Sequence, residues 1–386
     1  MIRTLVASTT EVDDITLAVK DIMSQLNPGK NLLKNTVGIV ACHYEFITSG
    51  MVKEICNTLP FDTVGTISNA QAIPGAAATL IFSIMVITSD TIEFVKAITE
   101  PLNEEPNKKI INCYRNVKKD KKPSLILTFA PFMLQNSGDE YIEALAEATE
   151  NTPCFGTLAV DDTNDFSNCF TIDNGEHYPD KMILLMIYGN INPKFYIANI
   201  SNDKIFDKAA LITKSHRHTI MEVNNRPIID FLKDVGLAKA SETQYAMSSL
   251  PFLLDYNDGT PPVAKIFMQL SEEKYAICAG NVPEGSTLYL CSTDREDVLF
   301  TTGQAIETMI KDIENASGVI IYSCISRIMA MGGINPFGEM NLINEKLNGK
   351  INFLFAHSGG EICPTQISNT KAINRFHNNT LVICLF

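Results

Sequence analysis

The sequence has 386 residues, enough for two or three domains with separate cores, and 45% of them are hydrophobic, as in ordinary globular proteins. The formal net charge is −13, from 31 Lys and Arg against 44 Asp and Glu, which excludes nucleic acid as an expected partner because phosphate binding needs clustered cations. The longest apolar stretch, residues 76–87, is shorter than the roughly 20 residues of a membrane-spanning helix, so no membrane partner is expected.

The first predicted element is a helix that Thr10 caps and that runs to about residue 26, where Asn27, Pro28 and Gly29 stop it. Apolar residues recur along this segment at the spacing of one helix face.

A series of elements then occurs three times: an apolar strand, a helix, a second apolar strand that runs into glycine, and a further apolar strand. The first copy has strand 37–41, a helix at 49–59 with Ser49 as N-cap, and strands 63–65 and 79–87. Residues 101–109 resemble a surface connection. The second copy has strand 125–129, helix 138–149 with Ser137 as cap, and strands 154–156 and 182–188. The third has strand 319–322, helix 338–347, and strands 353–360 and 380–386. We therefore predict an α/β fold with mixed sheets built from three strand-helix-strand-strand repeats, whose strand-end loops converge on a shared site.

The segment before the third repeat has a different character. Strands are predicted at 263–270, 275–279 and 287–291, joined by connections too short for crossover helices, which indicates an inserted antiparallel meander. A helix at 301–315 follows. We place the main boundary near residue 204, with repeats one and two in 1–203 and the meander plus repeat three in 204–386.

The residues with the most specific chemistry follow strands of the third repeat. Cys324 and Arg327 come directly after strand 319–322, and Gly360 and Glu361 come after the next strand. His377 and Asn378 lead into the last strand. Strand-end side chains of neighbouring strands project into the same crevice, so Arg327 and Glu361 are expected to approach one another there. The spacing alone favours the structural alternative, in which Cys324 is a buried thiol and Arg327 and Glu361 form an ion pair.

These residues also carry a resemblance. "YSCISR" with Cys324 and Arg327, "GGEICP" with Glu361, "FHNNTLVICL" and the "NVPEGS" of residues 281–286 resemble the C-terminal half of the FIST sensory domain family. Residues 8–90, with "TVGTISNA", resemble its N-terminal half, although Ser68, Asn69 and Ala70 replace an acidic Gly-Glu-Ile-like turn. The resemblance implies a cytoplasmic sensory domain that binds small ligands such as amino acids and signals to a downstream protein in trans.

Three functions remain open on this basis. In a ligand sensor, Arg327 would bind the carboxylate of an amino acid and Glu361 its ammonium group, with Cys324, Gly360, His377 and Asn378 around them. In a cysteine-dependent hydrolase or transferase, Cys324 would be the nucleophile and His357 or His377 its base. In an interaction scaffold, an edge strand of the meander would recruit a partner. We expect the sensor, and no catalytic residues.

Other motifs are weaker. Ten cysteines without a Cys-x-x-Cys pair favour a reducing, cytoplasmic compartment. His216 and His218 lack a nearby acidic or cysteine partner, and the acidic run 161–165 lacks the glycine and glutamate of a calcium loop, so no metal site is predicted. No phosphate-binding loop, nucleophile elbow or dinucleotide fingerprint is present, and no cofactor is expected.

Overall fold

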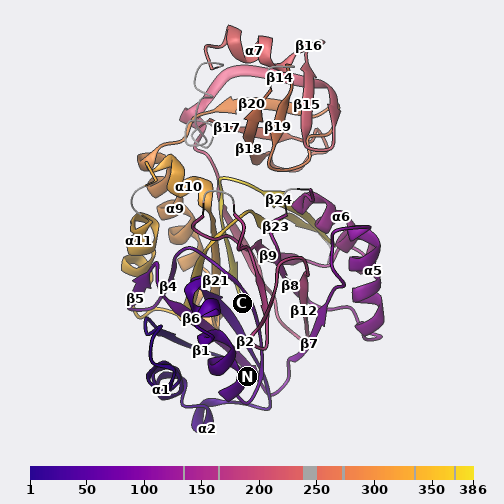
Figure 1. Ribbon diagram of the computed structural model, residues 1–386. Helices are drawn as coiled ribbons and strands as arrows, with labels where there is room; N and C mark the ends of the chain where they lie inside the picture. Colours follow the sequence, from indigo (N-terminus) through magenta and orange to yellow (C-terminus); the bar gives the residue numbers. More distant parts are fainter. Residues whose placement is uncertain (134, 164–165, 238–249, 272–273, 334–335, 369–370) are drawn as a thin grey trace.

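Three mixed sheets of six strands form the body, and a small barrel stands at one end of it (Figure 1). The computed structural model describes residues 1–133, 135–163, 166–237, 250–271, 274–333, 336–368 and 371–386. The first sheet has the order β1 (Ile2–Thr9), β6 (Phe82–Ser89), β2 (Asn35–Cys42), β3 (Asp62–Ile67), β10 (Thr171–Asp173) and β11 (Glu176–Tyr178). The second has β7 (Glu93–Ile98), β12 (Ile183–Tyr188), β8 (Leu125–Ala130), β9 (Cys154–Leu158), β23 (Glu361–Ser368) and β24 (Lys371–His377). The third has β13 (Lys194–Ala198), β25 (Leu381–Leu385), β21 (Val319–Cys324), β22 (Phe353–Ser358), β4 (Gln71–Ile73) and β5 (Ala76–Ala78).

The three repeats are therefore joined in a ring. Each contributes four strands to its own sheet, and its hairpin completes a neighbouring sheet: β4–β5 joins the third sheet, β10–β11 the first and β23–β24 the second. In each sheet the first central strand is parallel to the next and antiparallel to the last. Leu125 to Phe129 and Val319 to Tyr322 thus occupy the same place in their sheets. Strands from both sides of residue 204 share sheets, and that position marks the start of the barrel.

Side-chain alternation explains why the central strands are apolar throughout. In β2, Val37 and Ile39 face one core shared by all three sheets, while Val40 faces a separate outer cluster. Equivalent strands behave alike: Leu127 of β8 and Tyr322 of β21 reach the shared core. Burial on both faces removes the polar positions that a one-sided sheet would show.

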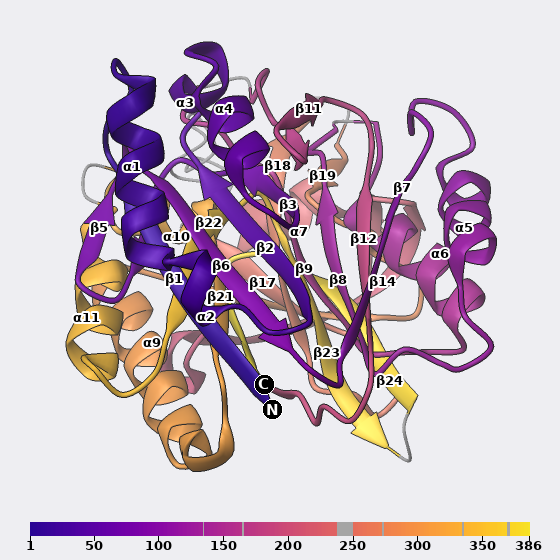
Figure 2. The same ribbon diagram turned by 90° about the horizontal axis from the view of Figure 1, so that it is seen from below.

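Helices cover the outer faces, one group to each sheet (Figure 2). On the first sheet lie α1 (Ile15–Leu26), α2 (Pro28–Asn31), α3 (Glu45–Thr48) and α4 (Met51–Thr58). On the second lie α5 (Pro106–Val117) and α6 (Gly138–Thr149), and on the third α9 (Arg295–Ile310) and α11 (Phe337–Leu347). The short α10 (Ile325–Ala330) follows β21. No helix in these described ranges is long and apolar enough to cross a bilayer.

Several local predictions were wrong. Asp14, and not Thr10, caps α1, because its side chain accepts a hydrogen bond from the Leu17 amide at 3.0 Å. Gly50 occupies the N-cap of α4 in place of Ser49. Ser137 does cap α6, as predicted. The surface connection predicted at 101–109 ends earlier than expected, because α5 begins at Pro106 and its amphipathic pattern follows that residue.

The inserted segment is a closed barrel and not a meander. Its six strands run in the order β14 (Ile205–His216), β20 (Thr287–Cys291), β17 (Pro251–Asp255), β18 (Val263–Leu270), β19 (Ala276–Cys278) and β15 (Thr219–Val223), and β15 pairs back with β14. The short β16 (Arg226–Pro227) pairs with β15, and α7 (Ile228–Asp234) follows. Of the three strands predicted as a meander, only β18 and β19 pair with each other, whereas β20 pairs with β14 and β17. Closure removes the free edge that an interaction scaffold of the predicted kind would use.

The glycines of the repeats are not all equivalent. Gly65 and Gly156 lie within β3 and β9, where an added Cβ would fall about 2 Å from the Val40 and Thr128 carbonyl oxygens of the parallel neighbour. The third repeat has Phe355 inside β22, and its Gly359 and Gly360 follow the strand. Close approach to the parallel neighbouring strand therefore explains the first two glycines, whereas an added Cβ at Gly359 would fall 2.9 Å from the Ala159 carbonyl oxygen.

Candidate functional site

The sequence-predicted residues gather at one end of the third sheet. Cys324 ends β21, Glu361 begins β23 and His377 ends β24. Because β21 is parallel to β22 and antiparallel to β25, the segments that follow β21 and β22 lie beside the segment that precedes β25. All six residues are buried, and Cys324, Arg327, Glu361, His377 and Asn378 are each at most 2% exposed.

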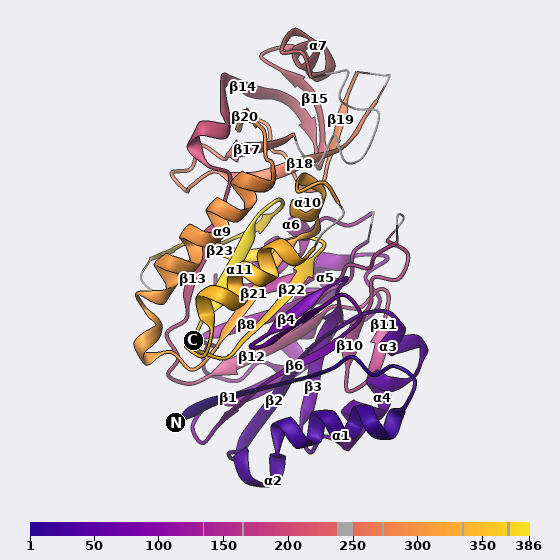
Figure 3. The same cartoon turned by 90° about the vertical axis from the view of Figure 1, so that its left-hand side faces the viewer.

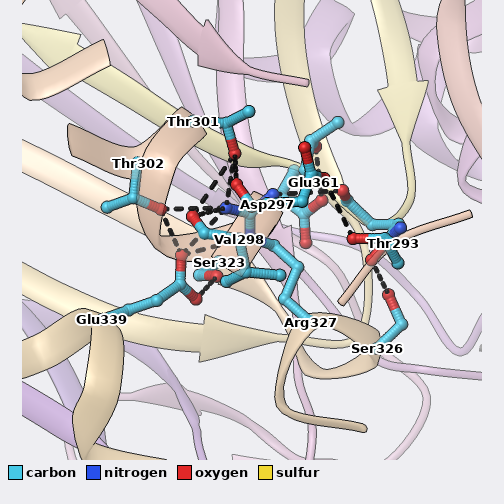
Figure 4. A network of polar contacts seen from close by, with 12 residues as sticks. Thr293, Asp297, Val298, Thr301, Thr302, Ser323, Ser326, Arg327, Glu339 and Glu361 are labelled. Carbon is cyan, nitrogen blue, oxygen red and sulfur yellow. Dashed lines mark hydrogen bonds and ion pairs between the residues drawn. The ribbon is translucent and has the colours of Figure 1, made fainter. Parts of the chain in front are cut away.

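Arg327 pairs with Glu339 of α11 and not with Glu361 (Figure 4). Its Nε donates to Glu339 Oε1 at 3.1 Å, and its NH2 donates to the Val298 carbonyl at 3.0 Å and to Thr302 Oγ1 at 2.9 Å. Its NH1 lies 3.4 Å from the Asn379 carbonyl. Because its donors bind protein atoms, the guanidinium has a structural role and holds α9, α10 and α11 together.

Glu339 completes this network as a charged group. It accepts hydrogen bonds from Thr302 Oγ1 at 2.5 Å and Ser323 Oγ at 2.7 Å. Burial alone would raise its pKa, but the charge of Arg327 and these two hydrogen bonds outweigh burial and hold the pKa below its usual value. Glu339 was not predicted as a site residue. A signal was present, because Glu339 lies four residues before the apolar Ile343 and therefore on the same inward face of α11.

Glu361 lies in a different environment. Thr380 Oγ1 donates to its Oε2 at 2.8 Å, while burial raises the pKa of the carboxyl well above its usual value. The pKa shift of Glu361 is therefore opposite in direction to that of Glu339. A carboxyl whose charged form is disfavoured by burial is poorly suited to bind the ammonium group that the sequence interpretation assigned to it.

Cys324 has the properties of a buried thiol. Burial raises its pKa to about 12, and the Ser326 hydroxyl lies 3.2 Å from its Sγ. The hydrogen bonds found for its Sγ in the described ranges involve no histidine. Burial also lowers the pKa of His357 to about 4 and that of His377 to about 3, so both imidazoles are neutral.

Gly360 and His377 pack within the second sheet, and Asn378 connects it with the barrel. Gly360 has φ +151°, and an added Cβ would lie 2.4 Å from the Phe376 ring. His377 Nε2 lies 3.2 Å from the Cys363 carbonyl, and the Asn378 amide donates to the Ala264 carbonyl of β18 at 3.0 Å. These contacts are with the protein itself, so packing explains the glycine.

A pocket of about 480 Å³ opens on the other side of α10. Strand ends of all three repeats build it: His43 and Glu45 follow β2, Asn69 follows β3, and Asp161, Asp162, Thr163 and Phe166 follow β9. Helix α10 supplies Ile325, Ile328 and Met329. None of the six predicted site residues is among its lining residues. The convergence of strand-end loops was predicted, but the residues that line the pocket were not.

The lining is acidic. His43 Nε2 lies 3.2 Å from Asp162 Oδ2, and the Asp162 side chain is 56% exposed. Asp161 is buried and shapes its own loop, accepting from Thr163 Oγ1 at 2.7 Å and the Asn168 amide at 2.9 Å. Glu45 adds a third carboxylate, and no Lys or Arg is among the lining residues found in the described ranges. The acidic run 161–165, for which the sequence predicted no metal site, thus contributes to a pocket wall through 161–163.

In the described part of the chain, no group of three or more His, Cys, Asp and Glu side chains is arranged to hold a metal ion. This covers His216 at the end of β14 and His218 after it.

Comparison with known families matches residues 36–226 to the FIST N domain and residues 229–364 to the FIST C domain. The chain belongs to the FIST family. The two FIST matches meet between residues 226 and 229, inside the barrel, so each includes part of it. A comparison with curated proteins found no match.

Proposed function

We propose that this FIST protein is a cytoplasmic sensory protein that binds a small ligand in the strand-end pocket. The observation that carries the proposal is the pocket itself, whose volume of about 480 Å³ lies within the range of small-molecule sites. Its position outside the carboxyl ends of strands is where α/β sheets usually bind ligands. Ten free cysteines are consistent with a reducing compartment.

The lining favours a ligand that carries a positive charge. Three carboxylates and one imidazole surround the pocket. A ligand ammonium group would form charge-assisted hydrogen bonds with Glu45 and Asp162, whose side chains reach solvent. An amino acid or another small amine meets this requirement.

The six sequence-predicted residues have a supporting role in this proposal. None of them lines the pocket, and the Arg327 guanidinium donates hydrogen bonds to Glu339 and to Thr302 of α9. Ligand contact through Ile325, Ile328 and Met329 would reach Arg327 by way of α10, the helix that holds all four residues.

The state of Cys324 favours binding over turnover. A nucleophilic cysteine needs a lowered thiol pKa and a base within hydrogen-bond reach. Burial raises the pKa of Cys324 instead, to about 12. We propose that the signal is the ligand-bound form of the protein and not a reaction product. A separate downstream protein would bind that form in trans.

A thermal-shift screen of the full-length protein tests the proposal. Amino acids and other small amines should raise the melting temperature, because a ligand of the folded state stabilises it by about 2.7 kcal/mol at 100 times its dissociation constant. Carboxylic acids of similar size without an amine should not. Asp162→Asn should reduce the shift, whereas Asp90→Asn should not, since Asp90 is exposed and follows β6 at the opposite end of the first sheet. Absence of any shift across the amines would refute the proposal.

A further inference from the structure

We infer that the barrel is the responding part of this protein and that the Arg327 network couples it to the pocket. The inference rests on the proposed function, because it describes how occupation of that pocket would be transmitted. It is carried by hydrogen bonds that run from α10 through α9 to both chain crossings between body and barrel. Figure 3 shows α9 beside the barrel, and Figure 4 shows Arg327, Val298, Asp297 and Thr293.

The first step is within α10, which has six residues and two different faces. Ile325, Ile328 and Met329 line the pocket, while Ser326 and Arg327 are buried on the other side. A helix this short moves as a unit. Pressure on its pocket face therefore displaces the Arg327 guanidinium.

The second step connects α10 with α9. Arg327 NH2 donates to the Val298 carbonyl and to Thr302 Oγ1, which lie in the N-terminal half of α9. Thr302 in turn donates to Glu339, so its hydroxyl joins the cation, the carboxylate and the helix at one point. A shift of Arg327 has to break these bonds or move α9 with it.

The third step connects α9 with the barrel. Asp297, in the first turn of α9, accepts hydrogen bonds from Ser201 and from Thr293 Oγ1, the latter at 3.1 Å. Ser201 precedes β14, the first barrel strand, and Thr293 follows β20, the last. The neighbouring Asp294 pairs with Lys204 at 2.6 Å. Both crossings thus converge on the first residues of one helix.

A second contact between barrel and body is built around a buried ion pair beside the Phe376 ring. Lys265 of β18 is fully buried, and its Nζ lies 3.0 Å from Asp139 Oδ2 of α6 and 2.9 Å from the Phe376 carbonyl. The Asn281 amide also donates to Asp139, at 2.7 Å. Charged contacts of this kind can separate because each ion regains its hydration when exposed, whereas apolar faces resist exposure. The barrel can therefore leave this contact while its crossings remain attached to α9.

Backbone hydrogen exchange on the full-length protein, with no added ligand, tests the coupling. Ile328→Ala alters only the pocket face of α10, and it should speed exchange in peptides that contain Ser201 and Ser292 at least about fivefold, the lower end of typical coupling between sites. Thr302→Val removes the shared hydroxyl with little change in shape, so the added effect of Ile328→Ala should vanish in that background. Thr308→Val is the matched control, because this exposed threonine of α9 bonds only the Gln304 carbonyl of its own helix. In the control background the fivefold effect should persist.

Peptides from α1, which packs on β1 and α4, report any global loss of stability. If Ile328→Ala fails to fold, Ile328→Val provides the smaller perturbation. An unchanged exchange rate at both crossings, or an equal effect in the Thr302→Val background, would overturn the inference. Either result would leave ligand binding to be judged by the thermal-shift screen, and failure of that screen would leave the coupling intact.

Discussion

Replacement of Arg327 by Met should expose the dependence of the fold on one buried ion pair. Arg327 and Glu339 are 2% and 0% exposed at their side chains, and the substitution leaves the carboxylate buried without its cation. Removing one partner of a buried pair costs about 3–5 kcal/mol of unfolding free energy. Urea denaturation at pH 7.5 measures the loss. The magnitude alone does not identify the cause, because any large core substitution can destabilise to this extent.

The pH dependence does identify it. In the wild type the folded-state pKa of Glu339 lies below its unfolded value, so its stabilising contribution is present at neutral pH and is lost as the pH falls through the folded pKa. Without Arg327, burial raises the folded-state pKa, and stability is then lost as the pH rises through it. The stability difference between wild type and Arg327→Met should therefore be larger at pH 8 than at pH 5. The double variant Arg327→Met, Glu339→Gln should be more stable than Arg327→Met at pH 8. A double variant that is equally or less stable would refute the reasoning.

Three other predictions follow from single residues. Gly360→Ala should lower the unfolding free energy by about 1–3 kcal/mol, through contact with Phe376, whereas Gly349→Ala, with φ +66° and open space, should lose only about 1 kcal/mol of strain in the same urea assay. Cys324→Ser should leave the affinity for the best amine of the screen nearly unchanged, and mass spectrometry should find Cys324 unlabelled by thiol reagents at pH 7.5 while the protein is folded; rapid labelling would contradict its pKa of about 12. The raised pKa of Glu361 predicts stability that is lost as the pH rises through that pKa, so melting temperatures from pH 5 to pH 9 should fall less in Glu361→Gln, and equal slopes would show that Glu361 is not the titrating group.

The repeats could be predicted from the sequence because their central strands are apolar on both faces and their helices have a clear period. Strand 319–322 and helix 338–347 correspond to β21 and α11. The hairpins could not be predicted, because β4 and β10 have only three residues each and pair with strands of other repeats. Barrel closure was missed because β14 pairs both with its neighbour in sequence, β15, and with β20, which lies about 70 residues further along the chain.

The location of the candidate residues at strand ends was predicted from the sequence, but their contacts were not. The spacing of Cys324, Arg327 and Glu361 predicted that they lie at neighbouring strand ends. It could not predict that Arg327 pairs with Glu339, which lies on α11. Both glutamates are buried, but the Arg327 charge lowers the pKa of Glu339 while burial raises that of Glu361, and this difference in environment was not visible in the sequence. The pocket could have been predicted from His43. This residue directly follows β2, the strand of the first repeat that is equivalent to β21, which Cys324 ends.

Calorimetric titration of the best amine from the screen into a blocked pocket tests the central claim most directly. Thr79 is an exposed residue of the pocket wall, and Thr79→Trp places an indole there at little cost to the fold. Thr308→Trp puts the same side chain on an exposed face of α9. We predict that Thr79→Trp abolishes the heat of binding and that Thr308→Trp keeps the wild-type affinity. Wild-type affinity in Thr79→Trp would show that the ligand binds elsewhere and would contradict the account.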